Sequence, residues 1–534
     1  MGLKNYNFFY LLAFFVLIFL ILTYSYTLED AQITYRYALR YSEGYPWGTW
    51  NRNEVPIEGF TTVLWMFVIS LFGPSLNSIA HASKVIGGFS ALGLVFLFFT
   101  LSVKCQKGEI TFINNNFALN KASLFTAIFC ALSLPINWYA TSGMETVTFI
   151  FLISLTLLGP LIKINILIYS LTCIALVAIR PEGIMFAIAS TLFFGTRDRR
   201  YLYVLFIIII VFITIFVHRY LLFKEIMPNT YLAKSGDAGL RHLKFGIFYF
   251  GSFIISYWYI FLPFLAMPII LKRKILTLRK DNFYFIGIFG IALFYIIIAK
   301  SGGDNFSAFP HWRHGLVLLP IVALFSFYTL FQLNIRYSSH IASFICILNF
   351  ILPIISVFPS SQAMSRFYNL GDFSIQHNML NNPMFIWLRE NNRNDITIAT
   401  SLAGELPLTV DFNHIDILGL NDRTIAHLGL FDPHGPVDSK TYMSYVIDRM
   451  PEIIEAYFPP ECVTQIDREC LLRARPMMTM DLLSNPAFVE GYLLIENAPY
   501  EYFNRSLFIR KDYYLSYGRL HGIVGIKWLS PFYQ

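Results

Sequence analysis

Long runs of apolar residues recur along the first two thirds of the chain, separated by short polar stretches. A bilayer core needs about 20 apolar residues per helical crossing, and runs near that length recur from Phe8 to Phe358. Only Lys4 precedes the first run and no small-residue cleavage site follows it, which indicates a retained anchor. By length we predict about eleven membrane helices, at about residues 8–28, 81–103, 122–137, 145–161, 164–180, 183–196, 201–218, 246–271, 283–299, 315–333 and 340–358.

Basic residues gather in every second loop between these runs. They are Lys104, Lys107, Lys121, Lys163, Arg197, Arg199, Arg200, Lys272, Arg273, Lys274, Arg279, Lys280 and Arg336. Cytoplasmic loops carry an excess of Lys and Arg, so we predict that these loops and the N-terminus face the cytoplasm. An odd number of crossings then places residues 29–80 and everything after about residue 360 on the outer side.

One further apolar run, Gly59 to Phe72, is short and is ended by Gly73-Pro74. Counting it as a crossing would invert every later loop and move the basic clusters outside. We therefore interpret it as a helix that lies in the membrane interface or enters the membrane only partway.

The composition of the chain changes after Ser360, where polar and charged residues become frequent. The runs "DITIATS" and "RSLFIRKDYYL" are strand-like, and "KTYMSYVIDRMPEIIEAYF" is helix-like. We predict two domains: residues 1–359, a polytopic helical domain whose first outer loop is 29–80, and residues 360–534, an extracytoplasmic α/β domain. Cys462 and Cys470 both fall in the second domain, and whether they pair stays open.

Composition agrees with a membrane protein. Hydrophobic residues make up 56% of the chain and charged residues 14%, and the mean hydropathy is +0.55, above the level of ordinary soluble domains. The inner loops account for most of the net charge of +7, so this charge does not indicate nucleic-acid binding. We find no phosphate-binding glycine loop, HExxH, paired CxxC or Gly-x-Ser-x-Gly motif.

Charged residues also gather in the predicted outer loops, where cations run against the charge bias of the rest of the chain. Besides Glu29 and Asp30, these loops hold Arg36, Arg40, Glu43, Glu58, Glu145, Arg180, Glu182, His218, Arg219, Lys234, Lys300, Asp304, His311, Arg313 and His314. Lys and Arg residues in loops where the positive-inside rule disfavours them suggest that an anion is bound there. Ordinary explanations stay open: Thr27-x-x-Asp30 fits a capping box at the start of a surface helix, and single arginines often reach lipid headgroups.

Seven short motifs follow one another in a fixed order. They are the acidic pair with "AQITYRYA", "EGFT" at Glu58, "SGMET" at Glu145, "RPEG" at Arg180, "PNTY" followed by Lys234, "GGD" followed by Arg313, and "IDILGLND". Together they resemble the GT-C fold membrane glycosyltransferases over nearly the whole chain. Within them the chain is most similar to the bacterial group that includes the terminal arabinofuranosyltransferase of mycobacterial cell-wall arabinan. That family commonly has two aspartates where this chain has Glu29 and Asp30, and its "GRF" reads "HWRHG" here.

The resemblance implies transfer of a sugar from a polyprenyl-phosphate donor to a cell-envelope glycan on the outer face of a bacterial plasma membrane. Asp30 would be the general base of an inverting displacement, with Glu29 beside it. Arg313 would bind the departing phosphate, with His314, Lys300, Lys234 and Arg180 as further candidates. The candidate substrate-binding residues are Tyr35, Arg36, Glu58, Glu145, Glu182, Asn229, Asp304, Asp416 and Asn421.

No cofactor is assigned by the sequence. A divalent cation bound by the outer carboxylates stays open, because their spacing gives no coordination signature. Two other functions also stay open: a transporter or flippase of lipid-linked glycans, and a non-catalytic envelope assembly protein. A transporter is expected to show charges near mid-membrane and internal repeat symmetry, whereas here the charges stand at helix ends.

Overall fold

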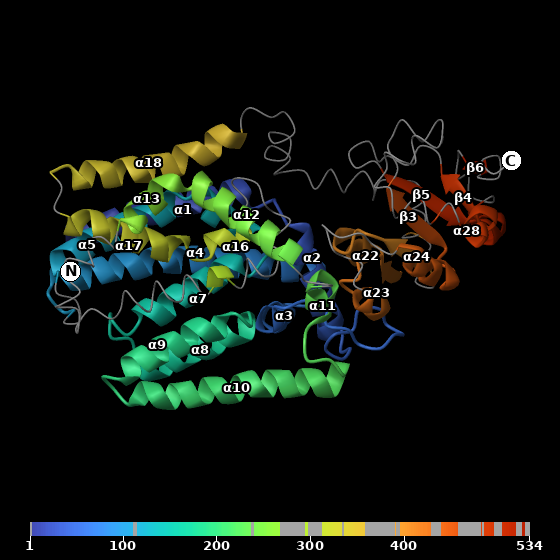
Figure 1. The fold of residues 1–534 in the computed structure, drawn as a ribbon, viewed down its shortest axis with the longest axis horizontal. Helices are drawn as coiled ribbons and strands as arrows, with labels where there is room; N and C mark the ends of the chain where they lie inside the picture. Colours follow the sequence, from blue (N-terminus) through green and yellow to red (C-terminus); the bar gives the residue numbers. More distant parts are fainter. Residues whose placement is uncertain are drawn as a thin grey trace.

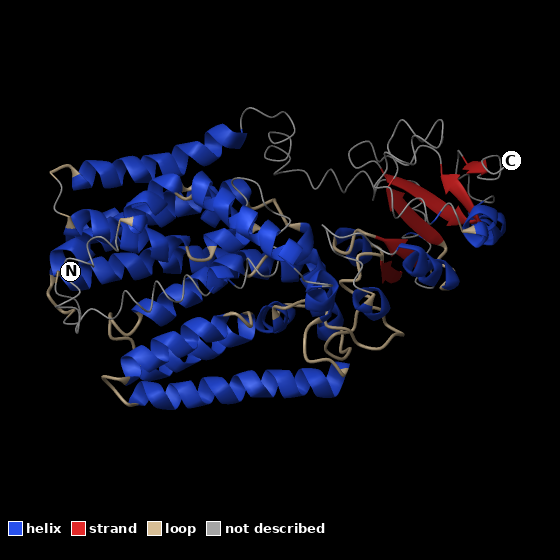
Figure 2. Ribbon diagram, viewed as in Figure 1, coloured by secondary structure: helices blue, strands red, loops and turns tan. Residues whose placement is uncertain are grey.

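A computed structural model describes residues 3–110, 115–235, 240–266, 294–296, 312–333, 336–357, 390, 396–428, 439–457, 482, 485–495, 505–518 and 526–528. The helical region lies before residue 358, and the described strands all follow residue 396 (Figure 1). Within these residues the chain is mostly helical with one small sheet (Figure 2). The predicted boundary at 359/360 and both Cys462 and Cys470 lie outside the described residues.

Nearly every predicted apolar run forms a helix or a pair of helices; the run at 283–299 is described only at 294–296. The elements are α1 (Leu3–Thr23), α2 (Glu29–Ser42), α3 (Val63–Ser70), α4 (Leu76–Gln106), α5 (Asn116–Leu132), α6 (Leu134–Thr141), α7 (Thr146–Leu158), α8 (Ile166–Ile179), α9 (Gly183–Gly195), α10 (Arg200–Phe223), α11 (Asn229–Ser235), α12 (Leu240–Ser256), α13 (Trp258–Leu265), α16 (Arg313–Leu316), α17 (Leu319–Gln332) and α18 (Ser338–Val357).

Helix length limits how many of these elements meet the criterion for a crossing. Among the described residues, α4, α10 and α18 are long and apolar enough, and up to five spans result if the bent pairs α5–α6 and α12–α13 each count as one. Helices α7, α8, α9 and α17 have 13 or 14 residues, which rise about 20 Å against a hydrocarbon core of about 30 Å. The described helices therefore include three to five candidate membrane spans by length and composition and do not fix the number of crossings.

Helix α2 begins differently from the sequence expectation. Its N-cap is Leu28, no side chain caps it, and the hydroxyl of Thr27 has no partner among the described residues. The capping box that the sequence left open as an alternative is therefore not formed. The helix is also no surface helix, because the residues from Ala31 to Ala38 are all buried.

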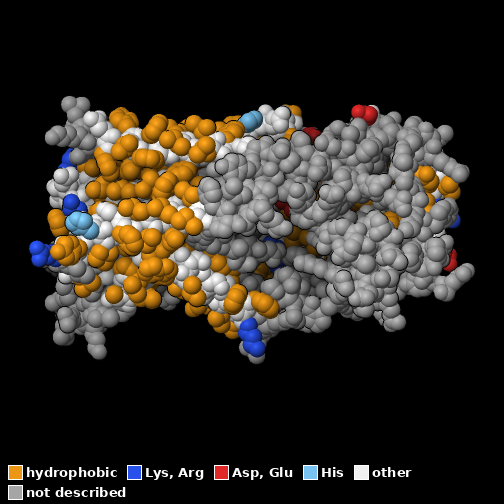
Figure 3. Space-filling model, turned by 90° about the horizontal axis from the view of Figure 1, so that it is seen from above, with side chains coloured by type: hydrophobic (Ala, Val, Ile, Leu, Met, Phe, Trp, Pro, Cys, Tyr) orange, Lys and Arg blue, Asp and Glu red, His pale blue; other side chains and the backbone are white. Residues whose placement is uncertain are grey.

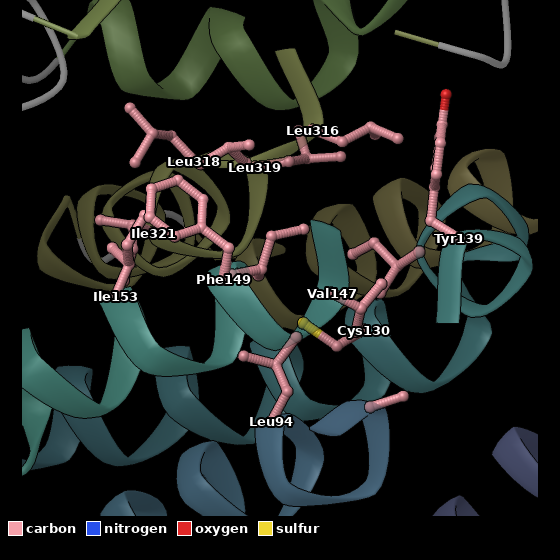
Figure 4. Packing of buried hydrophobic residues seen from close by; sticks show 14 of the residues in the cluster. Leu94, Cys130, Tyr139, Val147, Phe149, Ile153, Leu316, Leu318, Leu319 and Ile321 are labelled. Carbon is pink, nitrogen blue, oxygen red and sulfur yellow. The ribbon is translucent and has the colours of Figure 1, made fainter. Parts of the chain in front are cut away.

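The core of the helical region is one continuous apolar cluster. In Figure 4, Phe149 of α7 lies next to Leu318 and Leu319 at the start of α17, and Leu94 of α4 lies next to Cys130 of α5. These helices come from distant parts of the sequence, so the cluster holds the start of α16 close to the earlier helices. Residue Arg313, at the start of α16, is thereby brought to the end of the bundle that α2 occupies.

The second region is a six-stranded mixed sheet. The strands are β1 (Thr397–Thr400), β2 (Asn413–Asp416), β3 (Ile453–Tyr457), β4 (Tyr492–Ile495), β5 (Arg505–Arg510) and β6 (Ile526–Trp528), in the order β2-β1-β3-β5-β4-β6. Strand β1 runs parallel to β2 and β3, with Thr400 opposite Asp416, and the other pairs are antiparallel. The short helices around the sheet are α22 (Glu405–Thr409), α23 (Arg423–His427), α24 (Ser439–Asp448), α28 (Pro486–Gly491) and α29 (Lys511–Tyr513), which a π-helical turn (Tyr514–Gly518) follows.

Local patterns in this region were only partly informative. "DITIATS" contains β1 as predicted, and the start of "RSLFIRKDYYL" is β5, but its second half is helical. The helix predicted over "KTYMSYVIDRMPEIIEAYF" is wrong for its second half, because the helix ends at Asp448 and β3 begins at Ile453. Pairing with β1 and β5 decides this segment, since strand propensity depends strongly on the neighbouring strands.

Candidate functional site

The start of α2 is held by the loop that carries the "SGMET" motif. The backbone N–H of Leu28 donates to the carbonyl of Ser142 at 2.9 Å. Gly143 has φ +86°, and a Cβ placed there would lie 2.0 Å from the hydroxyl of Tyr35 and 3.0 Å from the Cβ of Ala31. Only glycine combines this backbone conformation with so close an approach. The loop thus places Glu145 beside the first turn of α2.

Asp30 forms an ion pair with Arg313 across 283 residues of sequence. The distance from Arg313 Nη1 to Asp30 Oδ2 is 2.9 Å, and the side chains are 7% and 33% exposed respectively. The arginine is therefore fixed in the protein, while the carboxylate keeps an accessible side. This is the pair that the sequence motifs nominated as base and phosphate-binding residue.

Arg180 joins two further carboxylates next to this pair. It donates through Nη1 to Glu145 at 2.8 Å and through Nη2 to Glu182 at 2.9 Å. Burial acts to raise the pKa of Glu182, but the charge and hydrogen bond of Arg180 outweigh it and hold this pKa below its usual value, with His314 acting the same way. The positive charge of Arg313 in turn acts electrostatically on the guanidinium of Arg180. Asp30, Glu145, Arg180, Glu182, Arg313 and His314 therefore form one charged cluster.

Several polar atoms in this cluster and in the residues next to it in sequence have no hydrogen-bond partner within the described residues. They are Arg180 Nε, Glu182 Oε2, Thr146 Oγ1 and the indole N–H of Trp312, which directly precedes Arg313. Buried polar groups are nearly always paired in folded proteins, so each such atom asks for an explanation. Donors and acceptors left open around ion pairs are suited to binding a polar ligand.

Glu29 lies against the second region. Gly404, in the loop after β1, lies so close that a Cβ there would be 2.6 Å from Glu29 Cγ and 2.5 Å from its carbonyl oxygen. The two acids that are adjacent in sequence thus have different neighbours. Asp30 meets a cation, and Glu29 meets the backbone of the α/β region.

Arg36 lies in a joint between α2 and the α/β region. Its guanidinium donates to the carbonyls of Trp50 (3.1 Å), Phe412 (3.0 Å) and Pro407 and to Asn51 Oδ1 (3.3 Å). Burial and the nearby charge of Arg40 lower the pKa of Arg36. The four acceptors compensate for the loss of water around the charge.

Other predicted substrate-binding residues also belong to this joint. Asn229 donates to the carbonyls of residues 419, 420 and 422. Tyr37 donates to Asn421 at 2.9 Å, and Asp416 accepts from Asn421 and from the backbone N–H of Leu418. The carboxyl ends of β1 and β2 therefore meet α2. Arg36, Asn229 and Asn421 hold the two regions together, and Asp416 holds Asn421 in place.

Glu58 and Tyr35 are likewise bonded within the protein. Glu58 is paired on two atoms with Arg219, at 2.9 Å for the Nη2–Oε1 contact, and both side chains are almost fully buried. Tyr35 shares a 2.5 Å hydrogen bond with Ser83. Lys234 is exposed at the end of α11. Lys300, Asp304 and His311 lie outside the described residues.

The sequence reasoning missed Asn51, His414 and Gly404. The indole of Trp50 donates to His414 Nδ1 at 3.1 Å, and Asn51 contacts the backbone of His414, more than 360 residues away. Burial and the charge of Arg36 lower the pKa of His414 to about 3. No local pattern marks such residues, because their partners are brought in only by the fold.

Among the described residues, no group of three or more His, Cys, Asp and Glu side chains is placed to hold a metal ion. Glu58, Glu145 and Glu182 each have an arginine partner instead.

No family model, curated protein or solved structure matches this chain.

The family resemblance therefore stays a prediction from seven motifs. The geometry adds that six of those motifs, from the acidic pair to Arg313, contribute to either the charged cluster or the joint beside it.

Proposed function

We propose that this chain is an integral-membrane glycosyltransferase. Membrane placement is supported by the surface of the helical region, which is widely hydrophobic with Lys and Arg at its margins (Figure 3). Helix α10 is an example of this surface: only 11% of its most apolar 18-residue stretch is buried in the protein. An exposed apolar surface of this extent is expected to face lipid.

The proposed orientation has the basic loops in the cytoplasm and the α/β region outside. The connections α7–α8, α9–α10 and α17–α18, which carry Lys163, Arg197, Arg199, Arg200 and Arg336, lie at the left end of the bundle in Figure 1, and the sheet lies beyond the right end. This arrangement fits the positive-inside rule. We retain about eleven crossings as part of the proposal; several would need the bilayer to thin around short helices.

The observation that carries the enzymatic proposal is the Asp30–Arg313 ion pair. A partly exposed carboxylate and a fixed guanidinium, 2.9 Å apart, face the same space at the outer end of the bundle. Acceptor activation needs a proton acceptor, and departure of a phosphate needs a cation. The pair offers both.

In the proposed step, the acceptor hydroxyl oxygen attacks the anomeric carbon of the sugar. A new C–O glycosidic bond forms as the bond from that carbon to the phosphate oxygen breaks, and the configuration inverts. Asp30 accepts the hydroxyl proton, and the polyprenyl phosphate leaves with the bonding electron pair.

The donor class follows from the outer position of the site. Sugar nucleotides are made in the cytoplasm, so an outer site calls for a lipid-linked sugar carried across the membrane. We propose a polyprenyl-phosphate sugar as donor, a cell-envelope glycan as acceptor and the bacterial inner (plasma) membrane as location. Nucleic acid has no part in the proposal, and a divalent cation is not required by it.

The decisive experiment measures sugar transfer from radiolabelled polyprenyl-phosphate sugars to native envelope glycan by purified wild type and Asp30→Asn. We expect the wild type to transfer and Asp30→Asn to lose about 10²–10⁴-fold in rate with unchanged thermal stability. The matched control Glu29→Gln should keep most activity, because Glu29 faces Gly404. Lipid-linked glycan transport, or envelope assembly, that survives Asp30→Asn while no donor is used would instead support a flippase or an assembly protein.

A further inference from the structure

The connection between β1 and β2, residues 401–412, lies along helix α2. Gly404 lies against the first turn of this helix. The carbonyl of Pro407 accepts a hydrogen bond from Arg36 in the middle of the helix. Asp411 is paired with Arg40 in its last turn. One segment of the α/β region therefore follows α2 from its beginning to its end.

The contact at Gly404 leaves no room for a side chain. A Cβ placed there would lie 2.5 Å from the carbonyl oxygen of Glu29 and 3.1 Å from its carbonyl carbon. Glycine is the residue that lets two backbones approach so closely. Any larger residue at this position must therefore displace one backbone or the other.

Both backbones are also held from their other sides. In the connection, the N–H of Ser401 donates to Glu455 at 3.0 Å, and Ala403 is buried. At the start of α2, the N–H of Leu28 donates to the carbonyl of Ser142. Neither side moves freely, so both should share the displacement that a side chain at position 404 causes.

Asp30 directly follows Glu29, whereas Arg313 belongs to a different element, α16. A shift of the first turn of α2 therefore moves the carboxylate relative to the guanidinium. Catalytic groups must be held closely, because a misplacement of about 1 Å can lower a rate about 10²-fold. Gly404 thus acts on the proposed base through the backbone of Glu29.

We propose that Gly404 is a positioning residue for Asp30, and that the β1–β2 connection makes the α/β region part of the catalytic unit. This role requires no contact between the connection and the substrate. It rests on the function proposed above, in which Asp30 is the base.

Steady-state transfer and thermal unfolding of the purified full chain test this role. Gly404→Ala should lower kcat about 10–100-fold, while the donor KM and the unfolding midpoint stay close to wild type, because Arg313 and the sheet keep their contacts. Gly491→Ala is the matched control. It makes the same change in the α/β region, where a Cβ meets no described atom within 4 Å, and should keep the wild-type kcat.

An unchanged kcat in Gly404→Ala, or a lower unfolding midpoint and a higher KM without a lower kcat, would overturn the proposal. If Gly404→Ala does not fold, Glu29→Ala/Gly404→Ala replaces it. The shortened side chain gives part of the room for the new methyl group, but the carbonyl oxygen of residue 29 still conflicts with it. This protein should transfer more slowly than Glu29→Ala alone, and equal rates would also overturn the proposal.

A measurement without sugar transfer separates this role from the proposed function. The thiol of Asp30→Cys is labelled with a water-soluble maleimide, with wild type as the background. Adding Gly404→Ala should change the labelling rate, and adding Gly491→Ala should not. A changed rate in a protein that transfers no sugar would support the positioning role and count against the glycosyltransferase alone. An unchanged rate would overturn the positioning role.

Discussion

The charged cluster and the joint both contact α2 and both contain arginine–carboxylate pairs, yet they differ in how exposed their charges are. In the joint, Arg36 meets four acceptors. Glu58, whose backbone carbonyl accepts the N–H of Asn229, is sealed from solvent together with Arg219. In the cluster, Asp30 is one-third exposed.

This difference separates groups that hold the fold from groups that are available for chemistry. A charge fully bound by its own chain has no capacity left for a substrate, whereas an accessible carboxylate held by one cation has. The presence of charged residues in the predicted outer loops does not make this distinction. Variants of the joint should therefore change stability, and variants of the cluster should change activity.

The largest effect is expected from Arg219→Met in the joint. It leaves Glu58 buried without a partner, which should cost about 3–5 kcal/mol in the free energy of unfolding. Chemical denaturation in detergent measures this. The double variant Glu58→Leu/Arg219→Met should recover most of the loss, since apolar replacements of a buried pair are often tolerated. Equal loss in both variants would mean that shape, and not charge, holds this part of the joint.

Arg313→Gln should have the opposite profile. Removing the cation that we propose for the leaving phosphate should lower the transfer rate by about 10²–10³-fold. Stability should change by less than about 1 kcal/mol, because Asp30 is partly solvated. Steady-state transfer and thermal unfolding measured on one preparation test this. Arg313→Lys should retain part of the activity, and a large drop in stability with normal activity would place Arg313 among the structural residues.

Asn229→Ala probes the joint more gently. It removes the donor of three backbone carbonyls at residues 419, 420 and 422, which should cost about 1–3 kcal/mol. Faster hydrogen exchange in segment 413–427 should report the loosening. Exchange that is unchanged there would show that the α/β region docks without this side chain.

The smallest effects should appear as opposing pH dependences inside the joint. Burial raises the pKa of Asp416 to about 7, so its contribution to stability is present below about pH 4 and lost as pH rises through 7. The pKa of His414 is lowered to about 3, so its contribution is present above about pH 6.5 and lost as pH falls. Between about pH 4 and 6.5 the two slopes, each about 1 kcal/mol per pH unit at most, should nearly cancel.

Substitution should reveal each slope. Relative to wild type, His414→Gln should become more stable as pH is lowered from 6.5 to 4.5, and Asp416→Asn less stable. Unfolding midpoints at three pH values measure this, and the difference from wild type isolates the changed group. Parallel pH profiles in all three proteins would show that neither group titrates abnormally.

The sequence predicted those features that depend on local pattern. Apolar runs placed the helices within a few residues, and the end of the apolar pattern separated the helices from the sheet. The pairing of Asp30 with Arg313 was anticipated only as two motifs with complementary roles. The capping box at the start of α2 is not formed, because the backbone of Leu28 is bound by Ser142. The strand that begins at Ile453 was not predicted, because its partner strands are distant in the sequence. The roles of Arg36, Asn229 and Asn421 depend on contacts between the two regions, which no local pattern encodes.

The contact between Arg36 and the carbonyl of Pro407 spans 371 residues, and this separation has a consequence during synthesis. At about 5–20 residues per second, on the order of 20–70 s pass between the emergence of α2 and the arrival of its partner. Throughout that interval Arg36 and its neighbours must be satisfied by water or by another protein. A nascent chain halted before residue 407 would therefore keep α2 exposed without its partner. Quality-control proteases could recognise incomplete copies by this exposed helix.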